Sequence, residues 1–280
     1  MRYFEQHGYV YPEHSDEHMI TVKHLRDTHF DENYSYKDTS LWFKIKHGLL
    51  RFSLYLFVFL VVKLVHGVKI YGRKEFKKNK ELLKNGGITI CNHVFMWDYL
   101  VVLSAIRPIY GYFPAWATNF EGPNGPLIRN VGGIPVPTTN LRAMKKFKDV
   151  LDEELKNDRW LHFYPEGSMW FYYPDIRPLK PAVFKFAVNH NKPIIPLTIS
   201  FRPKDGIYKL YKRRPCVDIT IGKPIYPDET LSTKERIEKM HNDAYIVMQN
   251  MVGIKEGDPT FNTDQNISNY TMHKNLNPKK

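Results

Sequence analysis

Short apolar runs alternate with segments of helical period along most of this chain, and this alternation limits the folds available to it. Strand-like runs occupy residues 88–91, 109–116, 134–137, 160–164, 194–200 and 217–221. Helical periodicity appears at residues 75–84, 97–106, 140–157, 182–190 and 232–251. Apolar strands separated by helices predict an α/β fold, a layered sheet that is largely buried between flanking helices.

The most hydrophobic segment precedes these elements, at residues 49–65 (LLRFSLYLFVFLVVKLV). Its uncharged centre, residues 52–62, covers about 16 Å as a helix, against about 30 Å of bilayer hydrocarbon. Lysines and arginines flank it on both sides. A membrane-associated helix at 41–66 that dips into one leaflet, with both ends over anionic headgroups, accounts for both facts. A buried core helix is the alternative.

The chain divides into four segments on this basis. Residues 1–40 are polar and tyrosine-rich and are expected to form an irregular, solvated N-terminal arm. Residues 41–66 form the hydrophobic helix, and residues 67–252 form one α/β domain, which suits a chain of 280 residues. Residues 253–280 are rich in Asn and Lys and predict a disordered tail.

Composition limits the partners and the compartment. The formal net charge of +12 indicates an anionic partner, such as a membrane surface, a phosphorylated small molecule or nucleic acid. The chain shows no zinc spacing and no basic-aromatic interleaving, which argues against nucleic acid. Two unpaired cysteines and no apolar N-terminal signal favour the cytoplasmic face of a membrane, with monotopic or peripheral attachment. The oligomeric state is left open.

A histidine and an aspartate stand five positions apart directly after the first apolar run. His93 and Asp98 would diverge by about 140° on one helix, so they meet only if His93 lies on the turn before it. A neutral imidazole oriented by a carboxylate is a minimal general base. The alternative is a structural histidine beside a solvated first-turn acid.

Two further groups of polar residues stand beside strand-like runs. One group follows the strand-like run at 160–163 and reads Tyr164-Pro165-Glu166-Gly167-Ser168. Its carboxylate and hydroxyl suit the binding of a polar headgroup. The alternative is a plain turn without a binding role. Arg129, in the Gly125–Arg129 run, is a candidate anion ligand or a surface arginine.

Four blocks occur in a characteristic order: Asn92-His93-x4-Asp98, a Gly…Arg129 block entering Gly133-Ile134-Pro135-Val136, Pro165-Glu166-Gly167-Ser168, and Pro193-Ile194-Ile195-Pro196. In this order they resemble the glycerolipid acyltransferase family, over roughly residues 67–227. The resemblance implies an α/β acyltransferase fold preceded by membrane-associated helices. It also implies that His93 is the general base held by Asp98, and that Arg129 and Glu166, Gly167 and Ser168 line the acceptor's glycerol-phosphate pocket.

The activity implied is acyl transfer from acyl-CoA or acyl-carrier protein to the free hydroxyl of a lysophospholipid, foremost 1-acylglycerol-3-phosphate, giving phosphatidate. No metal or bound cofactor is implied. The alternatives are another lysolipid or glycerol-3-phosphate as acceptor, and a non-catalytic lipid-binding relative.

Two positions depart from the family's pattern. Met169 stands where the third block commonly has an arginine, and Pro137-Thr138-Thr139 supplies no basic residue after the second block. Arg177 and Lys180 are near in sequence and can take over the phosphate of the acceptor.

Overall fold

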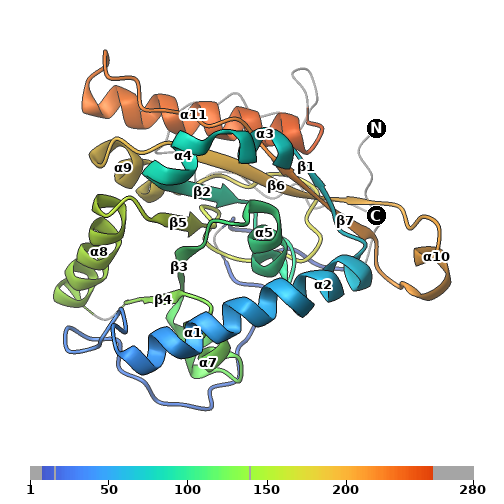
Figure 1. Cartoon of the computed structure of the whole chain (residues 1–280), viewed down its shortest axis with the longest axis horizontal. Helices are drawn as coiled ribbons and strands as arrows, with labels where there is room; N and C mark the ends of the chain where they lie inside the picture. The colour runs from blue at the N-terminus through green and yellow to red at the C-terminus, as the bar shows by residue number, and fades with distance from the viewer. Residues whose placement is uncertain (1–7, 16, 139, 255–280) are drawn as a thin grey trace.

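A seven-stranded sheet forms the centre of the protein in the computed structural model, which describes residues 8–15, 17–138 and 140–254 (Figure 1). The strand order is β1-β7-β6-β2-β5-β3-β4. Neighbouring strands run parallel except β6 and β7, which pair antiparallel. The strands are β1 Lys69–Tyr71, β2 Gly87–Cys91, β3 Gly111–Trp116, β4 Gly133–Val136, β5 Trp160–Phe163, β6 Ile194–Arg202 and β7 Cys216–Ile221.

Helices cover both faces of this sheet. Helix α5 packs on one face, and α8, α9 and α11 contribute to the core on the other. The predicted α/β fold, a layered sheet with flanking helices, is therefore confirmed. The helices of the domain are α3 Arg73–Lys78, α4 Lys80–Asn85, α5 Asp98–Ile106, α6 Ala117–Glu121, α7 Gly125–Asn130, α8 Leu141–Lys156, α9 Ala182–Asn189, α10 Tyr208–Tyr211 and α11 Thr233–Met251.

The central strand β2 is buried throughout, because both faces of the sheet are covered. Ile88 and Ile90 pack with the α8 and α9 side, whereas Cys91 packs with α5. Helix α8 begins where the sequence predicts, since the Asn140 side chain accepts a hydrogen bond from the Ala143 N–H at 2.7 Å. Because β2 runs parallel to β5 and β6, the carboxyl ends of these three strands lie at the same edge of the sheet.

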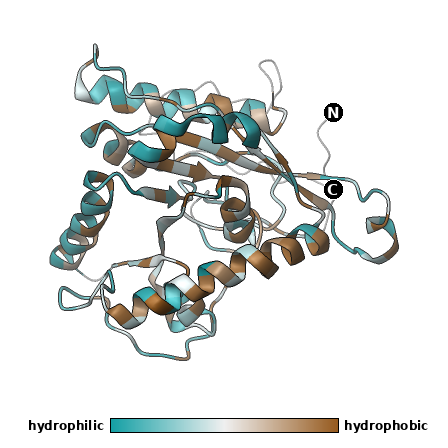
Figure 2. Cartoon of the chain, in the orientation of Figure 1, coloured by the Kyte–Doolittle hydropathy of each residue, from teal (hydrophilic) through white to brown (hydrophobic). Residues whose placement is uncertain are grey.

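The hydrophobic segment is one continuous helix, α1 Leu41–Ser53, a π-helical turn η1 Leu54–Val58 and α2 Phe59–His66. Its 26 residues are long and apolar enough to cross a membrane by length and composition alone. One side packs along the domain through Phe43, Leu54, Phe59 and Val62, which are buried. The opposite side is apolar and exposed along its whole length (Figure 2).

The structure corrects several details of the sequence analysis. Residues 8–15 and 17–40 contain no helix or strand, but they are packed and not simply solvated, because Tyr11, Phe30 and Tyr36 are buried. The expected helix at 75–84 is two helices, α3 and α4, divided at Asn79, which caps α4. The short strand β1 was not predicted. Of the expected tail, residues 255–280 lie outside the described residues.

Candidate active site

His93 and Asp98 meet as the sequence requires. Strand β2 ends at Cys91, His93 lies on the turn that follows, and Asp98 is the first residue of α5. His93 Nδ1 lies 2.5 Å from Asp98 Oδ2. The side chain of Asp98 is 3% exposed and that of His93 is 26% exposed, so the carboxylate is buried while the imidazole reaches the surface.

Tyr164 completes this pair, a role that its place at the start of the Tyr164–Ser168 run did not predict. Its hydroxyl donates to Asp98 Oδ1 at 2.9 Å, and its ring stacks on the His93 ring with centroids 4.1 Å apart and an angle of 18° between planes. Burial, reinforced by the charge of Asp98, raises the pKa of Tyr164 well above its usual range. The phenol therefore stays protonated and acts as a donor. The only signal in the sequence was its position two residues before Glu166.

These contacts set the chemistry of the imidazole. A carboxylate only accepts hydrogen bonds, so Nδ1 of His93 carries the proton and Nε2 holds the lone pair. A second histidine, His162, is buried close by on β5, and burial, followed by the charge of His93, lowers its pKa to about 3. His162 is therefore neutral near pH 7, and His93 is the histidine positioned to accept a proton.

The backbone around His93 is fixed from two sides. The side-chain amide of Asn92 pairs with β6, accepting from the Ile199 N–H at 2.7 Å and donating to the Ile199 carbonyl at 2.9 Å. On the other side, Glu166 Oε2 accepts from the His93 N–H at 2.9 Å, and the Trp170 N–H donates to the His93 carbonyl at 2.9 Å. Asn92 therefore joins the end of β2 to the backbone of β6.

Glu166 and Arg177 form a buried ion pair behind this turn. Arg177 Nη2 donates to Glu166 Oε2 at 2.9 Å, and the Arg177 N–H donates to Glu166 Oε1 at 2.9 Å. The Ser168 hydroxyl accepts from Arg177 Nη1 at 2.7 Å. All three residues are at most 2% exposed. Their polar atoms form hydrogen bonds inside the protein, where they hold the loop that contacts His93. Their predicted roles as ligands of the acceptor stay predictions.

Gly167 and Lys180 remain at the surface of the same loop. Gly167 has φ of +81°, which a glycine adopts readily, and a Cβ at this position would lie 2.7 Å from Lys180 Nζ. The ammonium group is thus packed against the exposed turn beside the buried cluster. Lys180 is half-buried. Of the predicted phosphate ligands, it is the one whose charged group lies beside the exposed Gly167 turn.

Arg129 is directed elsewhere. It lies on α7, where Nη1 donates to the Tyr36 carbonyl and Nη2 to the Ser35 carbonyl, each at 2.5 Å, and its guanidinium lies over the Tyr34 ring. These contacts tie α7 to the N-terminal arm. A role of Arg129 in binding the acceptor stays a prediction.

The N-terminal arm reaches the same cluster, although nothing in its sequence predicts this contact. The Ser15 carbonyl accepts from Arg177 Nη1 at 2.6 Å, and the Glu17 carbonyl accepts from Trp170 Nε1 at 2.9 Å. The Tyr11 ring stacks on Trp170 with centroids 5.6 Å apart. Trp170 in turn holds the backbone of His93, so the arm supports the candidate site from outside the domain.

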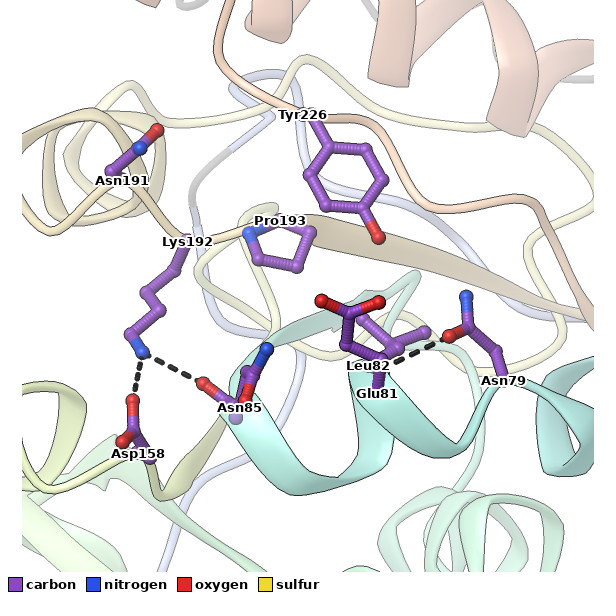
Figure 3. Close-up of a pocket in the computed structure, with 10 residues that line it drawn as sticks. Asn79, Glu81, Leu82, Asn85, Asp158, Asn191, Lys192, Pro193 and Tyr226 are labelled. Carbon is purple, nitrogen blue, oxygen red and sulfur yellow. Dashed lines mark hydrogen bonds and ion pairs between the residues drawn. The ribbon is translucent and has the colours of Figure 1, made fainter.

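A polar pocket of about 560 Å³ lies at the opposite edge of the sheet (Figure 3). It is lined by residues that precede β2, β5 and β6, among them Asn85, Asp158 and Lys192. Lys192 is engaged there by Asp158 and by the Asn85 carbonyl (Figure 3). His93 follows the carboxyl end of β2, so this pocket is not part of the candidate site. Within the described residues, no group of three or more His, Cys, Asp or Glu side chains is arranged to hold a metal ion.

Comparison with protein families identifies the class of domain that contains this site. Residues 67–200 match the family model described as Acyltransferase. These residues form an acyltransferase domain. The matched residues include His93, Asp98 and the Glu166–Arg177 cluster. The Ser15 and Glu17 carbonyls, which accept hydrogen bonds from this part of the domain, come from the N-terminal arm outside the match.

No curated protein matches the chain. Solved structures that match include the 1-acyl-sn-glycerophosphate (LPA) acyltransferase PlsC from Thermotoga maritima, at 19% identity and a TM-score of 0.49. That match covers 81% of this chain and all of the other.

Proposed function

We propose that this protein transfers an acyl chain from a thioester, acyl-CoA or acyl-carrier protein, to the free hydroxyl of a lysophospholipid, foremost 1-acylglycerol-3-phosphate. The observation that carries the proposal is the His93–Asp98 pair, with a buried carboxylate at 2.5 Å from Nδ1 and an imidazole that reaches the surface. The matched acyltransferase domain supports the reaction class. The net charge of +12 suits a phosphorylated acceptor, an anionic donor and an anionic membrane.

The reaction follows from the tautomer of His93. Nε2 removes the proton from the acceptor hydroxyl as the hydroxyl oxygen attacks the thioester carbonyl. Asp98 holds the imidazole in orientation and stabilises the imidazolium that forms. The tetrahedral intermediate then collapses, the carbon–sulfur bond breaks, and Nε2 returns the proton to the departing thiolate. This sequence needs no covalent acyl-enzyme and no cofactor.

The exposed apolar side of the α1–α2 helix supports a position for the enzyme at the surface of a membrane, where both the acceptor and the product reside. The basic residues that flank the helix on both sides favour the anionic cytoplasmic face. Lys180 is the candidate ligand for the acceptor's phosphate, since it lies against the exposed Gly167 turn.

The test is product identification by mass spectrometry, using purified protein, acyl-CoA and a panel of lysolipid acceptors with glycerol-3-phosphate. We expect phosphatidate from 1-acylglycerol-3-phosphate. Both His93→Ala and Asp98→Asn should lower turnover by about 10²–10⁴-fold, the usual contribution of a positioned general base. A second histidine–aspartate pair lies away from the site, with His190 Nε2 at 2.7 Å from Asp152 Oδ1. His190→Ala is therefore the matched control and should keep full activity.

Two results would reject the proposal. Turnover of His93→Ala within tenfold of the unmodified protein would remove the general-base role. Binding of acyl-CoA and lysolipids without any acylated product, in the folded protein, would identify a non-catalytic lipid-binding relative instead.

A further inference from the structure

The connection between β6 and β7 exposes large apolar side chains that no neighbouring element covers within the described part of the chain. It contains the short helix α10, and Ile207 and Leu210 are 65% and 85% exposed there. Tyr211 is also exposed. Aliphatic side chains at this level of exposure, grouped within five residues, mark a contact surface more often than a chance feature of a soluble domain.

This connection is bound to the end of the hydrophobic helix. Tyr211 donates from its hydroxyl to the Leu64 carbonyl at 2.7 Å, and Lys212 Nζ donates to the Val65 carbonyl at 3.0 Å. The last carbonyls of a helix have no partner within the helix, and leaving them unpaired in an apolar medium costs free energy. The donors from the connection satisfy them, so this end of the helix can lie at the level of the lipid interface.

The apolar surface of the helix thus continues onto the connection. Exposed side chains recur every three or four positions along one side of the helix, at Leu41, Ile45, Leu49, Phe52, Leu56, Leu60 and Leu64. Leu64 lies in the turn that Tyr211 contacts. Figures 1 and 2 show α10 projecting from the domain beside the end of α2, which is the most hydrophobic part of the helix.

The charge of the connection indicates which surface it meets. Residues 203–215 contain five basic residues and a single acid, Asp205, which is paired with Lys69. Lys209, Arg213 and Arg214 are exposed. Apolar side chains that alternate with exposed lysines and arginines are typical of segments that insert shallowly between anionic headgroups.

We propose that residues 203–215 form a second membrane contact, which inserts Ile207 and Leu210 into an anionic bilayer surface next to the α1–α2 helix. This contact adds to the hydrophobic helix and is separate from the catalytic chemistry. With two adjacent contacts, the helix and the connection together fix how the domain is placed on the lipid surface.

The test measures membrane contact directly in the full chain. Cys91 and Cys216 are buried, so a cysteine introduced by Leu210→Cys can be labelled selectively with an environment-sensitive dye. We expect a blue shift of the dye when vesicles of phosphatidylcholine and phosphatidylglycerol are added. The matched control is Leu141→Cys, at a site on α8 that is 89% exposed and outside both apolar contacts, where the dye should stay in water.

Affinity provides the second measurement. The variant I207S/L210S should bind mixed phosphatidylcholine–phosphatidylglycerol vesicles about tenfold or more weakly than the unmodified protein, because two aliphatic side chains no longer enter the bilayer. Leu141→Ser should bind unchanged. Phosphatidylcholine alone should bind the unmodified protein more weakly than the mixture.

Equal vesicle affinity of I207S/L210S and the unmodified protein would overturn the proposal. So would a dye at position 210 that stays in water while a dye at the helix, in Leu56→Cys, enters the bilayer. Neither measurement uses turnover, so an inactive protein would leave this result standing, and a failed membrane contact would leave the proposed reaction standing.

Discussion

Substitution of Arg177 separates two possible roles of this residue. Its position near Met169 suggested a ligand for the acceptor's phosphate, in which case Arg177→Ala would raise KM and leave stability unchanged. The structure instead buries Arg177, with donated bonds to Glu166, Ser168 and the Ser15 carbonyl of the arm. A buried positioning role predicts a large loss of stability together with a fall in kcat.

The magnitude follows from the buried ion pair that the substitution breaks. Removing one partner of such a pair costs about 3–5 kcal/mol, because the remaining charge is left without compensation. This is a large share of the roughly 5–15 kcal/mol that stabilises a typical domain. Arg177→Ala can therefore fail to fold, and Arg177→Lys is the second variant. Lysine keeps the charge but not the planar fork that donates to four acceptor atoms on Ser15, Glu166 and Ser168, so we expect a loss of about 1–3 kcal/mol.

The assay pairs urea unfolding, followed by tryptophan fluorescence, with steady-state kinetics of acyl transfer. For Arg177→Lys we expect a lower midpoint of unfolding and a lower kcat at unchanged acceptor KM, because Glu166 no longer holds the His93 N–H in place. Lys180→Met is the matched control. Loss of its charge-assisted contact with a phosphate should raise the acceptor KM by about 10–100-fold and leave kcat unchanged, the opposite kinetic pattern.

The reverse pattern would refute this reasoning. An Arg177→Lys protein with unchanged unfolding and a raised acceptor KM would restore Arg177 as the phosphate ligand. A double-mutant cycle with Glu166→Gln adds a second criterion, because a true buried pair gives a coupling energy of about 0.5–3 kcal/mol and independent residues give additive losses.

Two further predictions concern the side chains around the His93–Asp98 pair. Tyr164→Phe keeps the ring stacked on His93 but loses the hydrogen bond to Asp98. We expect turnover to fall about tenfold and stability by about 1–2 kcal/mol, measured by kinetics and urea unfolding; unchanged kcat would remove Tyr164 from the positioning network. His162 has a folded pKa of about 3, below the ordinary value of about 6.5, so between these values the unfolded chain binds the extra proton. Stability should therefore fall as the pH drops from 7 to 5, by about 2 kcal/mol from this residue, and His162→Gln should flatten that slope; identical pH dependence in both proteins would contradict the assignment.

The sequence predicted those parts of the molecule that depend on short windows. Strand β2 and the start of α8 follow from local apolar runs and from a capping residue, Asn140. The meeting of His93 and Asp98 was equally local, because only a turn before α5 brings positions five apart together. This candidate pair could therefore be identified without any knowledge of the tertiary structure.

Contacts between distant segments could not be predicted in this way. Tyr164 lies 66 residues from Asp98, and Ser15 lies 162 residues from Arg177. Nothing in the periodicity near Arg177 distinguishes a buried arginine from an exposed one, because burial depends on the arm and on Trp170, which packs over the guanidinium at 4.4 Å. The strand β1 was missed for a similar reason, since three residues pair only because β7 is beside them.

The departure at Met169 can now be explained in physical terms. Glu166 is buried and accepts the N–H of His93, so it needs a cation close by to offset the cost of burying its charge. Met169 cannot supply one, and it is itself buried. Arg177 supplies the charge from further along the chain, and the Ser15 carbonyl of the arm accepts one of the hydrogen bonds that this guanidinium has to donate. The arm, Arg177 and Glu166 therefore act as one unit, and the orientation of His93 depends on a segment that lies outside the acyltransferase domain.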